Sequence, residues 1–261
     1  MEFKRVVGTR RTIRFFKPWK PVERAKIQVM LEAANRSSRS INADYPKAVV
    51  VNRDDLPMEI RDALRNPTTT ADLDLAPTYI FWYTNLNYGD GAQDRLKELV
   101  RHGALAASHG WSEAYVDDVV YAQVLKPLLA DDAAKGWMGA IETGIAICNA
   151  LNAAVDEGLG VALHAFTAPD VVKDYCKVPD TWQPTWLMLV GYPAEDPEAG
   201  GQRPRRPLSA HFFEGSCDNP WQEDPEVTEY LKREGMIQRP GPLPWRQQEV
   251  RMLSRMFGLP E

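Results

Sequence analysis

Residues 144–163, GIAICNALNAAVDEGLGVAL, hold the pattern that decides the fold. The sequence predicts a helix over 138–157, because apolar and small residues recur at helical spacing on two faces. One face carries Ile141, Ile145, Cys148, Asn152 and Val155, and the other carries Ile147, Leu151 and Ala154. A helix that is apolar on more than one side is usually buried in a core or in a subunit interface. Gly158-Leu159-Gly160 predicts its end, after which residues 161–165 are expected to form a strand.

Shorter elements are predicted on both sides of this helix. Residues 22–36 predict an amphipathic helix. Its apolar face carries Ile27, Met30, Leu31 and Ala34. β-Branched or aromatic runs predict three further strands: 47–52, which we expect to be buried, 78–84 and 185–192. With a helix around 170–175, the order does not alternate as β-α-β units do, so the expected fold class is α+β.

The whole chain, 1–261, is expected to form a single domain with two appended segments. Residues 86–135 hold helical patches joined by Gly- and Ser-containing breaks, which is typical of a variable lid or insertion. Its Trp111, Tyr115 and Tyr121 either stack on an aromatic substrate or belong to a core. Residues 212–261 carry Pro and Trp with little periodicity, so we expect an extended C-terminal tail packed on its own domain or on a partner subunit.

The composition excludes several classes of protein. With 261 residues, 44% of them hydrophobic and 26% charged, the chain has the make-up of an ordinary globular protein. Its net charge of -5 argues against nucleic acid as the main partner. The sequence shows no run of roughly 18–20 apolar residues, as a membrane span needs, and no signal-peptide pattern. Cys148, Cys176 and Cys217 form neither a disulfide framework nor a zinc pattern, so we expect reduced thiols, no metal and a cytoplasmic protein.

Two basic clusters stand out on this acidic background. Arg10, Arg11 and Arg14 flank Thr12 near the N-terminus, and Arg203 and Arg205 follow the last predicted strand. Guanidinium groups bind phosphate through bidentate, charge-assisted hydrogen bonds, and a hydroxyl adds a neutral donor. Either cluster alone can equally be a solvated charged segment. Two such clusters in an acidic protein favour a shared anionic ligand.

A polar loop follows the first predicted helix. Residues 37–42 read SSRSIN and can offer hydroxyl, amide and backbone groups to a polar heterocycle. The alternative is an ordinary turn, since Ser and Asn favour turns for local reasons.

In their order and spacing these motifs resemble the nitroreductase family. RRTIRFF at 10–16 is similar to the family's opening Arg-Arg-Ser-x-Arg-x-Phe, with Thr12 in place of Ser. Residues 144–163 resemble the family's long dimer-interface helix and the turn after it. WLMLVGYPAE and RPRRPL resemble its last core strand and its phosphate-contacting segment. The likeness covers residues 8–52 and 137–210, and it implies a three-layer fold with a mostly antiparallel sheet flanked by helices, in an intertwined homodimer that binds FMN.

The resemblance also implies a role for each motif. Around the phosphate and ribityl chain of FMN it places Arg10, Arg11, Thr12, Arg14, Arg203 and Arg205. From the second subunit it brings Ser38, Arg39, Ser40 and Asn42 to the flavin. Backbone groups of Leu163, His164 and Ala165 would lie near the isoalloxazine ring. No side chain is expected to be an essential catalytic acid, because the flavin carries the hydride chemistry.

Two positions depart from the family pattern. Asp44 stands where the family often has a Gln, and a carboxylate cannot donate as an amide does. It either points away from the flavin or marks a changed substrate class. His164 lies near the expected ring edge, where a lone histidine is more often packed or hydrogen-bonded than a proton donor.

The activity that the resemblance implies is a ping-pong reduction. NADPH or NADH would reduce the flavin, which would then reduce an electron-poor small molecule such as a nitroaromatic, a quinone or an activated alkene. Relatives with other chemistry are alternatives because of Asp44 and the unmatched lid: reductive dehalogenases, oxidases and flavin-fragmenting enzymes. A flavin-binding protein without turnover is a third hypothesis.

Overall fold

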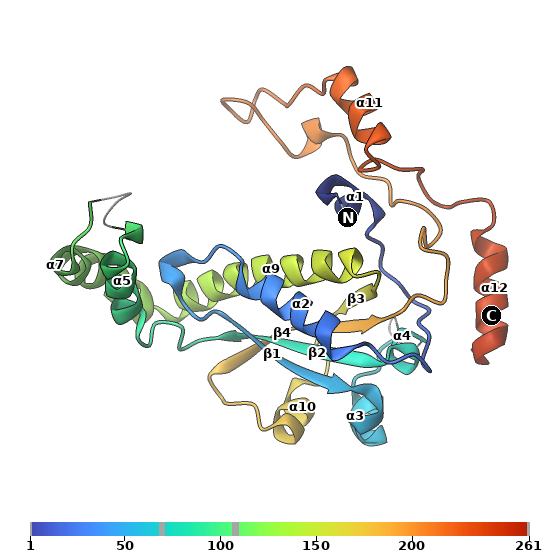
Figure 1. Cartoon of the computed structure of the whole chain (residues 1–261), viewed down its shortest axis with the longest axis horizontal. Helices are drawn as coiled ribbons and strands as arrows, with labels where there is room; N and C mark the ends of the chain where they lie inside the picture. The colour runs from blue at the N-terminus through green and yellow to red at the C-terminus, as the bar shows by residue number, and fades with distance from the viewer. Residues whose placement is uncertain (1, 68–70, 106–109, 260–261) are drawn as a thin grey trace.

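The fold is built on a four-stranded sheet. The computed structural model describes residues 2–67, 71–105 and 110–259. Its strands are β1 (Pro46–Asn52), β2 (Thr78–Asn85), β3 (Gly160–His164) and β4 (Trp182–Gly191). They lie in the order β1-β2-β4-β3, and each neighbouring pair is antiparallel. This sheet with helices on both sides confirms the predicted α+β class (Figure 1).

Different helices cover the two faces of the sheet. On one face, α2 (Arg24–Asn35) and α9 (Asp132–Asp156) pack over Ile80, Trp82, Met188 and Val190. On the other face lie α3 (Met58–Ala63), α4 (Ala71–Leu75) and α10 (Pro169–Cys176), which meet Tyr79, Phe81, Leu187 and Leu189. Alternate strand residues thus point to opposite cores, as the period of two in a strand requires. The arrangement has three layers, as predicted (Figure 1).

The long helix α9 is buried on one of its two apolar faces only. Its buried face carries Ala146, Ile147, Ala150, Leu151 and Ala154, and its exposed face carries Trp137, Ile141, Ile145 and Cys148. The helix has the length and composition of a membrane span, yet half of its most apolar window is buried in the domain. It therefore serves as a core helix with one apolar side left uncovered in this chain.

The two glycines after α9 have different physical roles. Gly158 has a φ of 75°, the left-handed conformation in which helices commonly end. Gly160 begins β3, and a Cβ atom there would lie 2.7 Å from Cγ1 of Ile13. Gly160 thus allows the N-terminal segment to pass close to β3, where Thr12 bridges Val161 in a parallel pair.

The strand β1 is not buried as predicted. It lies at the edge of the sheet, and each of its residues is half-buried or exposed. Its β-branched run packs one side on the core, while the edge position leaves the other side accessible.

The predicted lid has a small core of its own. It contains α5 (Ala92–Arg101), α7 (Glu113–Tyr115), the π-helical segment η3 (Val116–Leu125) and α8 (Lys126–Ala130). Ala92, Leu96, Val116, Val120 and Leu125 form its buried cluster. The lid lies at the N-terminal end of α9, far from the helix α1 (Phe3–Thr9) at the chain's start (Figure 1).

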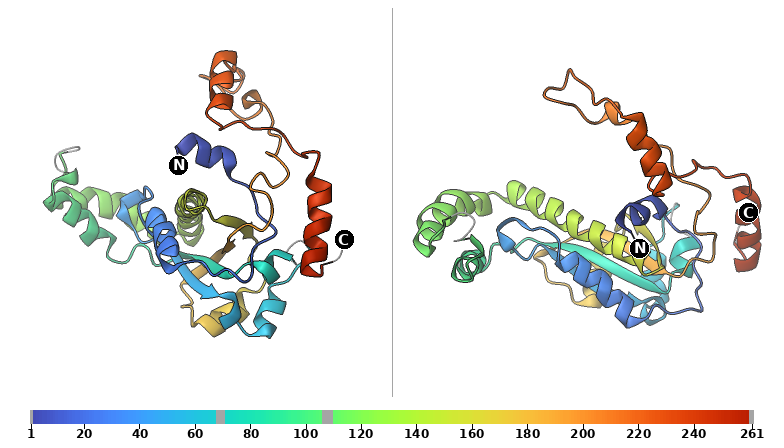
Figure 2. Two further views of the ribbon diagram at one scale, coloured as in Figure 1. Left: turned by 45° about the vertical axis from the view of Figure 1, so that its right-hand side comes forward. Right: turned by 45° about the horizontal axis from the view of Figure 1, so that its top comes forward.

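The C-terminal tail contains two helices that periodicity did not predict, α11 (Pro225–Arg233) and α12 (Arg246–Phe257). Helix α12 packs on its own domain through the buried Leu253, and Phe257 stacks on Phe15. Residues 203–230 instead form an arm that projects from the body in both views of Figure 2. The described residues also include the short 3-10 turns η1 (Ser40–Asn42), η2 (Arg53–Asp55) and η4 (Leu208–Ala210).

Candidate functional site

Arg203 and Arg205, both exposed, lie close enough to Arg10 for their charges to act on it, as does Cys148 of α9. Burial lowers the pKa of Arg10 first, and the neighbouring charges of Arg205 and Arg203 lower it further. Within the described ranges no carboxylate forms an ion pair with any of these three arginines. Arginine stays charged in proteins, so three guanidinium groups repel one another here without a protein counter-ion. The arrangement fits a phosphate, which each guanidinium can bind with two hydrogen bonds.

Arg11 uses its guanidinium inside the protein. The side chain is buried and donates hydrogen bonds to the carbonyl oxygens of Gly8 and Glu198 and to Oε1 of Gln238, at 2.7, 3.1 and 2.7 Å. It fastens the N-terminal segment to the turn after β4 and to the tail. The structure therefore brings Arg10, and not Arg11, to the pair Arg203 and Arg205. Thr12, the next residue, is half-buried beside β3.

Arg14, whose side chain is 37% exposed, reaches the buried carboxylate of Asp72. Its Nη1 lies 3.4 Å from Oδ2 of Asp72, and Nε2 of His164 lies 2.8 Å from the same oxygen. Asp72 is 1% exposed and His164 is 7% exposed. Nη1 of Arg14 is buried and has no hydrogen-bond partner among the described residues. An unsatisfied buried N–H is costly unless a ligand accepts from it, so Arg14 is poised to contact one.

His164 is hydrogen-bonded inside the protein, which is the role that the sequence favours for a lone histidine. Sequence reasoning missed its partner Asp72, which stands in the apolar stretch of α4 and 92 residues away in the chain. The sequence feature that could have revealed this pair is the charged Asp72 between apolar residues of α4, since a buried carboxylate needs partners.

Leu163, His164 and Ala165, which the resemblance places near the isoalloxazine ring, face different ways at the end of β3. Leu163 is half-buried on the α9 side of the sheet, whereas His164 points into the opposite core. Ala165 is exposed just after the strand ends. Because Thr12 bridges Val161 at the start of β3, the strand leads from the arginine cluster to these residues. A five-residue strand covers about 16 Å, and its backbone can follow an elongated ligand.

The polar loop is held by α9 and by the lid. The backbone N–H of Ser40 donates to Oε1 of Glu142 at 3.1 Å, and Arg39 donates to Oδ1 of Asn35 at 3.1 Å. Ile41 has a φ of 53° and packs against the lid cluster. A β-branched residue in this conformation is strained by about 1–3 kcal/mol, which the surrounding contacts must offset. Ser38 and Asn42 are exposed.

Asp44 points toward two cations. Its carboxylate oxygens lie 4.0 Å from Nη1 of Arg39 and 3.8 Å from Nη1 of Arg95. The charge of the residue that departs from the family pattern is thus balanced within the protomer.

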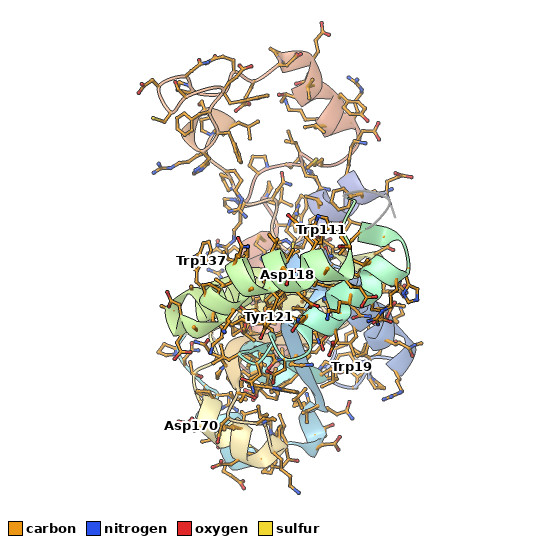
Figure 3. The ribbon with its side chains drawn as sticks, turned by 90° about the vertical axis from the view of Figure 1, so that its left-hand side faces the viewer. Trp19, Trp111, Asp118, Tyr121, Trp137 and Asp170 are labelled. Atoms are coloured by element: carbon orange, nitrogen blue, oxygen red, sulfur yellow. The ribbon has the colours of Figure 1, made fainter. Side chains whose placement is uncertain are left out.

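The lid, the loop and the arginine cluster follow one another along α9. The loop contacts the first half of α9 at Glu142, whereas Arg10 lies beside Cys148 farther along the helix. Trp111 and Tyr121 pack on the lid core, and Tyr115 is exposed 5.4 Å from the Trp111 ring. Figure 3 shows Trp111 and Tyr121 together at the lid end of the molecule.

Comparison with known proteins identifies the fold and the family. The model of the nitroreductase family matches residues 7–192. A nitroreductase-type protein of Exiguobacterium sibiricum, solved with FMN, has 16% identity and a TM-score of 0.65, over 80% of this chain and 95% of that one. A Staphylococcus epidermidis protein named as an NAD(P)H:FMN oxidoreductase has 13% identity and a TM-score of 0.63, over 82% and 95%. An enone reductase of gut-bacterial fatty acid saturation has 15% identity and a TM-score of 0.63, over 82% and 98%.

These TM-scores show a shared fold, and the family match covers well over half of the chain. The chain belongs to the nitroreductase family of oxidoreductases.

Proposed function

We propose that this protein is an FMN-dependent NAD(P)H oxidoreductase that reduces an electron-poor small molecule, such as a nitroaromatic, a quinone or an activated alkene. The observation that carries the proposal is the convergence of Arg10, Arg203 and Arg205 without a protein counter-ion. The FMN in one structural neighbour and the names of two others support the same chemistry.

The residues present fit FMN at both ends of the strand β3. Arg10, Arg203 and Arg205 would hold the phosphate, and the unsatisfied N–H of Arg14 would donate to a polar edge of the ring system. Backbone groups around Ala165 would border the isoalloxazine ring. When bound at these residues, FMN would supply the hydride chemistry between nicotinamide and substrate. The protein's contribution is to bind the cofactor, to orient it and to balance its charge.

We further propose that the active protein is a homodimer. The exposed apolar face of α9 carries Trp137, Ile141 and Ile145, and the projecting arm exposes Phe212, Phe213 and Trp221. Apolar surfaces of this kind are typical of sites that bind another protein. A second subunit would also bring its Ser38, Arg39, Ser40 and Asn42, and the lid with Trp111, Tyr115 and Tyr121, to a flavin site that one protomer leaves incomplete.

A reducing compartment suits this chain. Cys148 and Cys217 are exposed, Cys176 is half-buried, and all three are free. Exposed free thiols persist where the cell keeps them reduced, so we place the protein in the cytoplasm.

The test is the spectrum of the purified protein. A bound flavin absorbs visible light, and anaerobic NADH or NADPH should bleach it within a turnover. Menadione or a nitroarene should then restore the colour. A colourless protein that takes up no added FMN would exclude the proposal, and a flavin that neither nucleotide reduces would leave only the flavin-binding part of it.

A further inference from the structure

One side chain of the long helix α9 holds the polar loop that connects α2 to β1. Oε1 of Glu142 accepts a hydrogen bond from the backbone N–H of Ser40 at 3.1 Å. The loop lies at the lid end of α9 (Figure 1). We propose that Glu142 is the positioning residue of this loop, and that it keeps Ser40 and Asn42 in place for the flavin site of the second subunit. The hold on the loop stands by itself, whereas its consequence for the flavin rests on the proposed function.

Glu142 is an ionisable residue in a buried position. It is 8% exposed, and within the part of the chain that the structure describes no cation forms an ion pair with it. The two arginines around the loop, Arg39 and Arg95, are directed at Asp44 instead. A buried carboxylate without a counter-ion is costly, and a well-packed apolar residue in its place is often neutral or stabilising. The stability of the core therefore does not explain a glutamate at this position.

The phenols beside Glu142 do not balance its charge. Burial raises the pKa of Tyr45 and of Tyr88 above the usual value of a phenol, and the charge of Glu142 adds a smaller increase to both. Both phenols are therefore neutral, and Oη of Tyr88 has no hydrogen-bond partner among the described residues. Over the same residues, the N–H of Ser40 is the one donor that Glu142 binds. The loop is thus the partner that this carboxylate holds.

The backbone of the loop needs an anchor because it is strained. Ile41 and Asn42 follow Ser40 directly and have φ values of 53° and 51°. Asparagine tolerates this left-handed conformation, but it is unfavourable for a β-branched residue such as Ile41. The side chain of Ile41 packs on the lid cluster, which gives the loop a second contact. The hydrogen bond of Glu142 and this apolar contact together hold the strained turn.

The strained turn carries the polar groups that the proposed function assigns to the flavin. Ser40 and Asn42 are exposed on either side of Ile41 in the chain. Strained backbone persists where the surrounding structure holds it, and it is common where a segment contacts a ligand. Without the hydrogen bond to Glu142, Ile41 is free to relax and Asn42 moves with it. Glu142 thereby acts on the flavin through the loop.

Hydrogen–deuterium exchange of the intact protein tests the hold on the loop. Glu142→Leu removes the acceptor and keeps a buried side chain. Amide exchange in a peptide that covers residues 38–45 should become about 10- to 100-fold faster, the effect of losing a hydrogen bond to a charged group. Glu142→Gln keeps an accepting oxygen, so its exchange should lie between those of the parent and the Leu variant. Loop exchange that Glu142→Leu leaves unchanged would overturn the proposal.

A merely structural role predicts a different result. Because Glu142→Leu replaces a buried carboxylate that has no counter-ion, its melting temperature should equal or exceed that of the parent. Exchange in a peptide that covers β2 should stay slow in the same sample. The matched control is Thr143→Val, the next residue of α9, which is fully buried and accepts a hydrogen bond from Thr84 at 3.0 Å. It should lower the melting temperature and leave the loop as it is in the parent. Loop and β2 peptides that exchange faster together in the Leu variant would overturn the proposal.

FMN dissociation tests the consequence for the cofactor. It should become faster in Glu142→Leu, at most by the factor measured for loop exchange, and should not change in Thr143→Val. A released loop with an unchanged rate of FMN dissociation would uphold the hold on the loop and refute its role at the flavin. A parent protein that takes up no FMN would count against the proposed function, while the exchange experiment would still decide whether Glu142 holds the loop.

Discussion

Nε2 of His164 lies 2.8 Å from Oδ2 of Asp72 in a part of the core where both side chains are buried. The guanidinium of Arg14 lies on the same carboxylate oxygen. One carboxylate of α4 therefore ties the end of β3 to the N-terminal segment. Both of these border the proposed flavin site, so the stability of the core and the shape of the site depend on the same residue.

Asp72→Ala is expected to destabilise the protein strongly. Asp72 is buried, and its loss leaves the buried His164 without its hydrogen-bond partner, which costs about 1–3 kcal/mol. Asp74→Ala is the matched control on α4, because the Asp74 side chain is 38% exposed and its loss should cost less. Chemical denaturation of both variants measures the two free energies of unfolding. Equal losses would show that the Asp72 cluster is not the stronger interaction.

Arg10→Ala and Arg205→Ala are expected to weaken FMN retention and to leave the fold intact. Hydrogen bonds to a charged group contribute about 1.5–3 kcal/mol, so each variant should lose about 10- to 100-fold in affinity. Arg206→Ala is the control, since Arg206 does not contribute to the field at Arg10. Equilibrium dialysis gives the affinity, and circular dichroism checks the fold. Unchanged affinity in both variants would mean that the phosphate binds elsewhere.

Raising the salt concentration should separate Arg10 from Arg11. The proposed phosphate contacts of Arg10 are electrostatic, so FMN affinity should fall as salt screens them. Arg11→Lys is expected to destabilise the fold instead, because an ammonium cannot reproduce the four hydrogen bonds that the guanidinium donates. Affinity and melting temperature, each measured at 0.05 and at 0.5 M salt, would distinguish the two effects. A melting temperature that Arg11→Lys leaves unchanged would contradict this division of roles.

The sequence predicted those elements whose pattern is local. Helix α9 shows two apolar faces within its own residues. Which of the two is exposed depends on its packing against α2 and the sheet, and these contacts are distant in sequence. The run 47–52 predicted a strand correctly but not its burial, because edge position depends on the order of strands that are distant in sequence. Helix α12 was missed because its few apolar residues stand beside a Pro-rich stretch that hides the period.

The candidate site shows the same limit. Arg10 and Arg11 are adjacent and chemically alike, yet one lies near Arg205 and the other is bound to Gly8 and Gln238. The direction of each side chain is set by the backbone path along β3, which composition does not encode. Asp72 belongs to no sequence motif, and its partners Arg14 and His164 come from other elements of the fold, so the sequence did not identify it.

Glu195→Gln is expected to release α12 from the domain. Oε1 of Glu195 accepts hydrogen bonds from the backbone N–H groups of Arg14 and Phe15, at 2.5 and 3.0 Å. Its Oε2 lies 2.6 Å from Nη1 of Arg246 in α12, and the side chain is 0% exposed. An amide removes the charge that holds Arg246. The control is Glu198→Gln, whose ion pair with Arg239 is exposed.

Limited proteolysis measures whether α12 is released. In the Glu195 variant, cleavage near α12 should precede cleavage of the sheet, and the melting temperature should fall, because one partner of a buried ion pair has been removed. The Glu198 variant should behave like the parent protein. Proteolysis of both variants at the same rate would show that α12 is held by its apolar contacts alone.

Ile145→Glu is expected to produce a monomer that loses its flavin. Ile145 is 42% exposed in the centre of the apolar face of α9, so a carboxylate there is tolerated in the protomer. In a dimer it would be buried without a partner, which costs several kcal/mol. Val171→Glu is the control, because Val171 is 41% exposed but lies on α10, which covers the other face of the sheet. Light scattering gives the mass, and the visible spectrum gives the flavin content. Loss of the dimer with flavin retained would show that the second subunit does not complete the site, whereas a dimer that survives the substitution would place the subunit interface away from α9.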